Sequence, residues 1–353
     1  MYPINDIFIR RKNPEIIKPM VIAELSGNHG GSLKNALNLV EHAAKAGADA
    51  IKLQTYKAES MTLNINEGEF MISDSNSIWK GQSLFNLYER SSTPYEWHEE
   101  IFRYANKLNL IAFSAPFDLE AVDFLESLNV PCYKIASYEN IDHELIKKVS
   151  STGKPLIMST GMASEIELKE SVEAARESGC KDLVLLKCTS SYPASVSEIN
   201  LRTIPYLREL FKCNVGLSDH TTGNAVASSS VALGACAIEK HFTLDNNDQG
   251  SDSLFSANPD SFRQMVQGIH VVHESLGEIH FGPTKSEQSS VKKRRSLYIT
   301  ENIKKGEILT RKNIKSIRPG LGLSPKHLED VIGKKVLKNI DKGTPLSWDL
   351  LGE

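Results

Sequence analysis

Eight short apolar runs alternate with stretches of helical period through the first 277 residues of this 353-residue chain. The runs occupy residues 20–23, 50–53, 110–113, 132–136, 156–158, 183–186, 215–217 and 236–238. Several are apolar without interruption, as in the sequences MVIA and LVLL, which is typical of parallel strands covered on both faces. Strands that alternate with helices in this way predict an α/β fold, the (β/α)8 TIM barrel.

Local signals mark the ends of several helices between these runs. Ser164 and Glu167 have the spacing of a capping box, and we predict a second box at residues 93–96, with Pro94 at the first helical position. Asn258 precedes a closing helix that should end near Gly277.

One connection is much longer than the others. Residues 56–92 separate the second strand from the next helix, and this length is excessive for a plain barrel connection. Long loops at the mouth of a barrel usually carry function, so we expect this segment to form a lid over the strand ends.

The pattern changes after residue 277. Residues 278–295 are polar and lack periodicity, as an interdomain linker does. Short β-like pieces follow, separated by Lys-Gly turns at residues 305–306 and 342–343. We therefore predict a barrel domain at residues 1–280, a linker at 281–295 and a small β-rich domain at 296–353, whose own core would be marginal at that size.

Polar residues gather at the carboxyl ends of the predicted strands, which converge on one face of a closed parallel sheet. His220 and His241 follow successive strands, so we expect them to lie close together. With Asp219 and Glu239 nearby, the pair suggests a divalent metal ion with open positions for substrate and water. Alternatively, each histidine is an ordinary strand-end residue that caps a helix or bonds a carbonyl.

Composition and charge narrow the class of partner. A net charge of −3 indicates neither a nucleic acid nor an anionic membrane as the partner. The five cysteines lack CxxC spacing, which suits a reducing compartment. The first fifteen residues lack the pattern of a secretory signal, and no apolar stretch approaches the roughly 18 residues of a membrane span. We expect a cytoplasmic protein that acts on small molecules.

Seven motifs together resemble the sialic acid synthase family, whose members condense phosphoenolpyruvate with an amino sugar. The motifs are AELSGNHGGS at 23–32, DAIKLQTY at 49–56, YKIAS at 133–137, MSTGMAS at 158–164, KCTSSYP at 187–193, GLSDHT at 216–221 and IEKHFTLD at 238–245. The C-terminal sequences IKKGE and IRPGLGLSP resemble the antifreeze-like (SAF) domain of that family. Together the matches cover nearly the whole chain.

The resemblance implies roles for the matching residues. His220 and His241 would bind a divalent ion, manganese or magnesium, and Glu24 would act near the reacting end of the sugar, unless Glu24 merely pairs with Lys52. The cations and hydroxyl groups suit an anionic substrate such as phosphoenolpyruvate. The implied substrate-binding residues of the barrel are Lys52, Gln54, Lys134, Ser137, Ser159, Ser190, Tyr192, Ser218, Glu239 and Asp252.

The resemblance also implies a homodimer. In this family the SAF domain of one subunit covers the barrel mouth of its partner, and an arginine there contacts the N-acetyl group of the sugar. Arg318 occupies that position in this chain. Without the resemblance, Arg318 would be a surface arginine on a turn.

Two stretches narrow the expected sugar. Residues 77–102 and 250–260 are most similar to pseudaminic acid synthases within the family, whereas legionaminic and N-acetylneuraminic acid synthases are the alternative. Ser253 and Leu254 stand where neuraminic acid enzymes usually carry histidine and lysine. We expect the long segment at 56–92 and residues 254–257 to shape a pocket for a 6-deoxy, 4-acetamido sugar, with Leu254 and Phe255 as candidates for its apolar lining.

Two other classes fit parts of the sequence. Lys52, Lys134 and Lys240 would also suit a Schiff-base aldolase, which borohydride trapping with pyruvate would reveal. A binding protein whose SAF-like domain acts on ice or glycans is the other class, although such a scaffold would not need the polar strand ends of the barrel.

Overall fold

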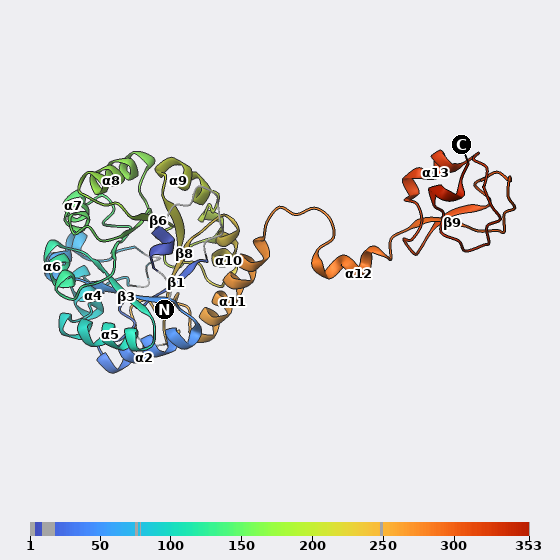
Figure 1. Ribbon diagram of the computed structural model, residues 1–353. Coiled ribbons are helices and arrows are strands. Elements are labelled where there is room, and N and C mark those ends of the chain that lie inside the picture. Colours follow the sequence, from blue (N-terminus) through green and yellow to red (C-terminus); the bar gives the residue numbers. More distant parts are fainter. Residues whose placement is uncertain (1–3, 9–17, 75–76, 78, 248–249, 353) are drawn as a thin grey trace. The chain divides into compact units, whose positions relative to one another are not determined.

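The computed structural model describes residues 4–8, 18–74, 77, 79–247 and 250–352. The chain divides into two compact units, Met1–Gly277 and Glu278–Glu353. In the first unit, eight parallel strands close into a barrel in chain order, with helices around the outside (Figure 1). The predicted TIM barrel followed by a small β-rich domain is confirmed.

Each predicted strand is present in the barrel. The strands are β1 (Met20–Glu24), β2 (Ala50–Thr55), β3 (Ile111–Pro116), β4 (Tyr133–Ile135), β5 (Leu156–Ser159), β6 (Leu183–Cys188), β7 (Asn214–Asp219) and β8 (Ala237–His241). The helices that follow them are α2 (Leu33–Ala46), α5 (Tyr95–Lys107), α6 (Leu119–Ser127), α7 (His143–Ser151), α8 (Glu165–Glu177), α9 (Thr203–Phe211), α10 (Ala225–Ala232) and α11 (Pro259–Leu276).

The helix caps agree with the sequence in most places. Ser164 and Glu167 form the predicted capping box of α8, and Asn258 caps α11 by accepting a hydrogen bond from the backbone of Ser261. The box predicted at residues 93–96 is wrong. Pro94 is itself the N-cap of α5, because the Thr93 hydroxyl instead lies 3.2 Å from Nε2 of His29.

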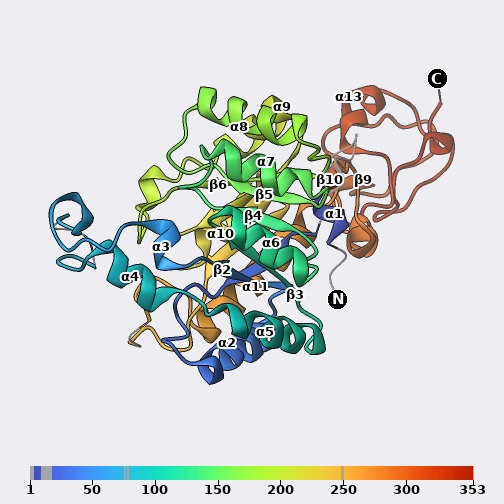
Figure 2. The same ribbon diagram turned by 90° about the vertical axis from the view of Figure 1, so that its left-hand side faces the viewer.

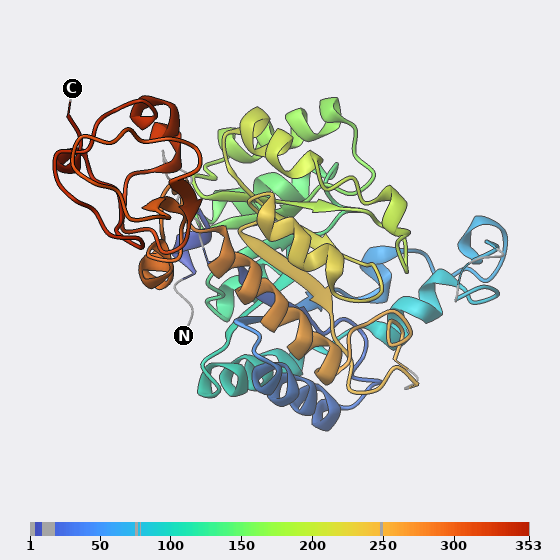
Figure 3. The same cartoon turned by 90° about the vertical axis from the view of Figure 1, so that its right-hand side faces the viewer.

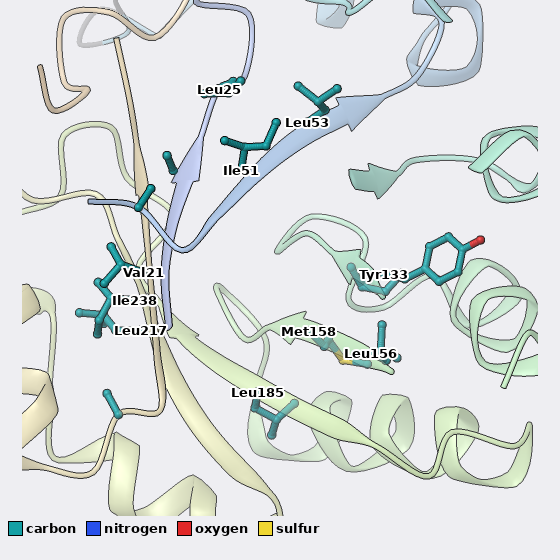
Figure 4. Close-up of a cluster of buried hydrophobic side chains, with 14 of the residues drawn as sticks. Val21, Leu25, Ile51, Leu53, Tyr133, Leu156, Met158, Leu185, Leu217 and Ile238 are labelled. Atoms are coloured by element: carbon teal, nitrogen blue, oxygen red, sulfur yellow. The ribbon is translucent and has the colours of Figure 1, made fainter. Parts of the chain in front are cut away.

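Side chains alternate between two apolar layers along each strand. Val21, Ile51, Leu217 and Ile238 belong to the outer layer, which packs between the barrel and its helices (Figure 4). Their strand neighbours form the inner layer, which fills the lower part of the barrel and consists of Met20, Ile22, Ala50, Ile111, Phe113, Cys132, Ile157, Val184, Leu186, Cys236 and Ala237. This period of two decides which strand-end residues point into the barrel.

The two ends of the barrel differ. The short helix α1 (Asn5–Phe8) lies at the amino ends of the strands, where Phe8 joins the inner apolar layer. The segment between β2 and α5 projects at the opposite end, as Figures 2 and 3 show from two sides. It contains α3 (Ala58–Met61), a 3-10 helix (Gly68–Phe70) and α4 (Leu84–Ser91), while residues 75, 76 and 78 of the expected lid lie outside the described residues.

The second unit has its own sheet and core. Strands β9 (Ser296–Ile299) and β10 (Ile314–Ile317) pair antiparallel, and the short helices α12 (Gln288–Val291) and α13 (Leu328–Val331) also belong to this unit. Its core contains Leu297, Ile299, Ile303, Leu309, Ile314, Val331, Val336, Ile340, Leu346, Leu350 and Leu351.

All five cysteines are free thiols buried in the fold. Within the described residues, no helix has the length and apolar character needed to cross a membrane.

Candidate active site

The inward-facing residues change from apolar to polar at the carboxyl ends of the strands. Above the inner apolar layer, the alternation places Glu24 on β1, Lys52 on β2 and Glu239 on β8 inside the barrel. Six buried residues form what we call the strand-end layer: Glu24, Lys52, Lys134, Ser159, Ser218 and Glu239. Buried charges are rarely retained without partners, so their pairing decides what this layer can do.

The charges of the strand-end layer are paired with one another. Nζ of Lys52 lies 2.5 Å from Oε2 of Glu24 and 3.0 Å from Oε2 of Glu239. Nζ of Lys134 lies 3.9 Å from Oε1 of Glu239 and donates a 2.6 Å hydrogen bond to the Ser159 hydroxyl. The Ser218 hydroxyl donates to Glu239 at 3.1 Å. Glu24 thus pairs with Lys52, and its role near the reacting end of the sugar stays a prediction.

Burial and pairing act in opposite directions on these groups. Burial lowers the pKa of Lys52 to about 8, with Lys134 adding to this effect and Glu239 opposing it. Burial alone would raise the pKa of Glu239, but Lys134 and Lys52 hold it below its ordinary value. The layer therefore keeps both signs of charge inside the barrel near neutral pH.

His220 and His241 lie side by side at the mouth of the barrel. His241 is the last residue of β8, His220 directly follows β7, and their ring centroids are 5.3 Å apart. The ring of Tyr192 packs against both, at 4.4 Å from His220 and 6.0 Å from His241. An ion pair at the same strand ends supports them, since Nζ of Lys240 lies 2.7 Å from Oδ2 of Asp219. Lys240 is thus a partner of Asp219 in a structural pair.

Hydrogen-bond acceptors face Nδ1 of both imidazoles. Nδ1 of His220 lies 3.0 Å from the carbonyl oxygen of Thr189, and Nδ1 of His241 lies 3.4 Å from Oδ2 of Asp252, without hydrogen-bond geometry. A proton on each Nδ1 is favoured by these acceptors, which leaves Nε2 available to a metal ion. Burial lowers the pKa of His241 and so favours the neutral, ligating form.

The donor set fits an open metal site. Burial acts to lower the pKa of His220 as well, but Cys188 and the carbonyl of Thr189 outweigh it, so the pKa is raised. Among the described residues, no group of three or more histidine, cysteine, aspartate or glutamate side chains is placed to hold a metal ion. Two imidazoles would therefore leave the other coordination positions to water and substrate.

A cavity of about 600 Å³ opens beside His241 and is lined by residues of several strand-end loops. It brings together the predicted residues Gln54, Ser137, Tyr192, His241 and Asp252. Ser190 lies close by, because a Cβ added at Gly161 would collide with the hydroxyls of both Ser190 and Ser137. Arg318 belongs to the second unit, where its side chain is exposed.

Glu139 lines this cavity and was not predicted from the sequence. Its Oε2 is buried without a hydrogen-bond partner, and burial raises the pKa of the carboxyl to about 7. A carboxyl with this pKa can carry a proton near neutral pH. The available signal was its position two residues after Ser137, in the loop that follows β4.

The prediction for Leu254 is wrong. Its side chain is 64% exposed and lines a different hollow, together with Arg90 and Asn246. Phe255 is buried instead and packs against the rings of Tyr192 and His241, 5.2 Å from each. Much of the apolar lining of the main cavity comes from the segment between β2 and α5, and Phe117 and Ala136 add to it.

Comparison with known proteins agrees with this geometry. A model of the NeuB family matches residues 39–281, and a model of the SAF domain matches residues 294–352. The chain belongs to the NeuB family. The resemblance to sialic acid synthases is thereby confirmed, and both units are those that the family motifs predicted.

Curated relatives of this NeuB-family chain are similar along almost its whole length. A pseudaminic acid synthase of Campylobacter jejuni subsp. jejuni serotype O:2 is 44% identical over 332 residues, which cover 93% of this chain and 95% of that protein. The N,N'-diacetyllegionaminic acid synthase of the same strain is 36% identical over 326 residues, which cover 91% of this chain and 97% of that protein. The N-acetylneuraminic acid synthetase of Leptospira borgpetersenii, solved with citrate, superposes with a TM-score of 0.69 at 30% identity, over 80% of this chain and 94% of that one.

Proposed function

We propose that this protein is an enzyme that joins phosphoenolpyruvate to 2,4-diacetamido-2,4,6-trideoxy-L-altrose and releases pseudaminic acid and phosphate. The observation that carries the proposal is the 44% identity to a pseudaminic acid synthase, against 36% to the legionaminic acid enzyme of the same strain. The cavity of about 600 Å³ also has a size that suits a small sugar substrate.

The strand-end layer and the neighbouring Ser137 supply the groups that a phosphoenolpyruvate site needs. Lys52 and Lys134 would bind the phosphate and carboxylate groups, while hydroxyl groups of Ser137, Ser159 and Ser218 would donate hydrogen bonds to them. All five are buried, so water is largely excluded and each contact is stronger than at the surface.

His220 and His241 would hold a divalent cation, Mn²⁺ or Mg²⁺, through Nε2. When bound, the cation supplies Lewis acidity toward the aldehyde oxygen of the sugar. Tyr192 keeps the two imidazoles in place through its ring contacts, and the carboxylate of Asp252 faces Nδ1 of His241.

The reaction needs only water besides the two substrates. The methylene carbon of phosphoenolpyruvate bonds to the aldehyde carbon, and the aldehyde oxygen takes up a proton. Water then adds to the oxocarbenium carbon and gives up a proton, and the carbon–oxygen bond to phosphate breaks to leave a keto group. Glu24, oriented by the backbone N–H of Ser26 at 2.9 Å, and Glu139, with its raised pKa, are the carboxyls that we assign to these proton transfers.

The product identifies the sugar. Phosphoenolpyruvate and a divalent metal ion would be supplied with each member of a panel of 2-acetamido sugars, and products would be analysed by mass spectrometry. We expect the diacetamido altrose to give kcat/KM at least about tenfold above that of N-acetylmannosamine. A higher kcat/KM for N-acetylmannosamine would instead assign an N-acetylneuraminic acid synthase.

We further propose a homodimer in which the SAF unit of each protomer completes its partner's site through Arg318. Helix α11 returns along the barrel to the end that carries α1, so the chain leaves the barrel at the end remote from His220 and His241 (Figure 3). Residues 278–295 could span at most about 60 Å if fully extended. Their 3-10 helix and α12 shorten this reach, so a neighbouring protomer is the easier target.

A mixing experiment tests the shared site. Protein with Arg318→Ala and protein with His220→Ala would be combined under conditions that exchange subunits. If the sites are completed in trans, each heterodimer contains one intact site, and roughly a quarter of wild-type activity should return at a one-to-one ratio, because half of randomly paired dimers are heterodimers. Activity that stays at the sum of the two separate variants would show that each protomer completes its own site.

A further inference from the structure

The segment between β2 and α5 forms an apolar wall on one side of the active-site cavity. We define the apolar wall as the side chains of Met61, Ile72, Leu84 and Leu87, which all line the cavity. Met61 ends α3, while Leu84 and Leu87 lie on the first turns of α4. The wall thus comes from the segment that directly follows β2 in the chain.

The backbone holds the wall in a defined position. Ile72 donates a 2.9 Å hydrogen bond to the carbonyl of Gln82 and accepts a 2.8 Å bond from the N–H of Gly81. The next pair along, Met71 and Ser83, forms an antiparallel bridge, and the Ser83 hydroxyl caps α4. The backbone of Ile72 is therefore fixed by its pairing with residues 81 and 82.

Trp79 connects this segment to the side of the cavity that carries His241. The indole N–H of Trp79 donates a 2.9 Å hydrogen bond to the carbonyl of Ser251, the residue before Asp252. The Trp79 ring also lies 6.4 Å from the ring of Tyr192. Trp79 therefore connects the segment that carries the apolar wall to the loops that carry Tyr192 and Asp252.

The two sides of the cavity differ in chemistry. Polar side chains of Gln54, Glu139 and Asp252 lie at the strand ends with His241, where the sugar aldehyde must react. The apolar wall comes from the segment that projects beyond those strand ends, which also contributes the polar side chains of Asp74, Ser77 and Ser91 to the cavity lining (Figure 2). A sugar with its aldehyde at the strand ends directs its remote carbon toward the projecting segment.

We infer that the apolar wall contacts the methyl group at carbon 6 of the sugar and selects 6-deoxy substrates over their 6-hydroxy counterparts. This inference rests on the proposed function, because it takes the substrate and the reacting end from it. A methyl group gains from apolar contact, whereas a hydroxyl group facing these side chains would lose its hydrogen bonds to water. An apolar pocket of this kind discriminates by roughly 10- to 100-fold.

The test compares two sugars that differ in one oxygen atom, 2,4-diacetamido-2,4,6-trideoxy-L-altrose and its 6-hydroxy form. Wild-type enzyme should favour the 6-deoxy sugar by at least about tenfold in kcat/KM. Met61→Gln places a polar group in the wall at similar volume, and Ile72→Thr does so with one side-chain atom fewer; each should lower this ratio about fivefold or more. Leu63→Thr is the matched control, since Leu63 lies in the same segment but is 62% exposed and outside the cavity lining.

Each outcome bears on the inference separately from the proposed function. A lowered ratio in both wall variants, with an unchanged ratio in the control, supports it. A wild-type ratio near one, or wall variants with the wild-type ratio, overturns it even while the enzyme still makes pseudaminic acid. If the wild type makes no nine-carbon product from the diacetamido sugar, the proposed function fails first. Because the readout is a ratio within one protein sample, partial misfolding of a variant does not alter it, and either wall variant suffices if the other fails to fold.

Discussion

Alanine at His220 or at His241 is expected to lower kcat at least about 10³-fold while leaving the barrel folded, a loss of about 4 kcal/mol of transition-state stabilisation. Each substitution would remove one of the two imidazoles that we assign to the metal ion. The strand ends that carry them keep the Asp219–Lys240 pair, and the apolar layers of the barrel are unaffected. The measurement is steady-state kinetics, with circular dichroism as the check on folding.

Metal binding itself provides an independent readout. Calorimetric titration with Mn²⁺ should show binding to the wild-type protein and at least about tenfold weaker binding to either variant. His42→Ala is the control, because His42 lies on the barrel surface in α2, where its Nδ1 faces the carbonyl of Asn38. EDTA should abolish activity of the wild type, and Mn²⁺ or Mg²⁺ should restore it. Full activity in metal-free buffer would contradict the metal role.

Lys52→Met is expected to lower the free energy of unfolding by about 3–5 kcal/mol and to abolish activity. The substitution keeps an unbranched side chain but removes the charge that lies 2.5 Å from Glu24 and 3.0 Å from Glu239. The negative charges of the buried carboxylates Glu24 and Glu239 would then lack the positive charge of Lys52 beside them. Denaturant unfolding followed by circular dichroism measures the effect.

Two controls separate charge from packing. Lys57→Met breaks an ion pair with Glu120 whose side chains are 56% and 83% exposed, so it should cost less than about 1 kcal/mol. Adding Glu24→Gln to Lys52→Met should recover at least about 1 kcal/mol, because one of the uncompensated carboxylates is removed. If the double variant is less stable than Lys52→Met alone, lost packing rather than uncompensated charge is the cause.

The barrel was predictable from the sequence because its strands are apolar on both faces. Most predicted runs were correct in place but short at their carboxyl ends, as in β7 and β8, which continue to Asp219 and His241. Polar side chains end an apolar run, yet the backbone there still pairs with the neighbouring strands. The period of two then accounts for the inward position of Lys52 and Lys134.

The parts of the site that were not predicted lie in irregular loops. Glu139 follows β4 in a loop, where no period fixes the direction of a side chain. The same limit explains why the segment at residues 56–92 was expected to shape the pocket without its lining residues being named, and why Leu254 was wrongly named as lining. The local motif at residues 93–96 suggested that Thr93 caps a helix. Its actual contact is with His29, 64 positions away in the chain, and a local motif contains no information about such a contact.

The pairing of charges in the strand-end layer also determines how an anion is admitted. Lys52 and Lys134 are balanced by Glu24 and Glu239, so the axis of the barrel presents no net charge from these four residues. An incoming anion binds by exchange, in which it replaces carboxylates that the lysines already hold. A small monovalent ion such as chloride offers too few contacts to drive that exchange, whereas a ligand with both phosphate and carboxylate groups can engage both lysines at once. Glu24 and Glu239 thus compete with every anionic ligand for the two lysines.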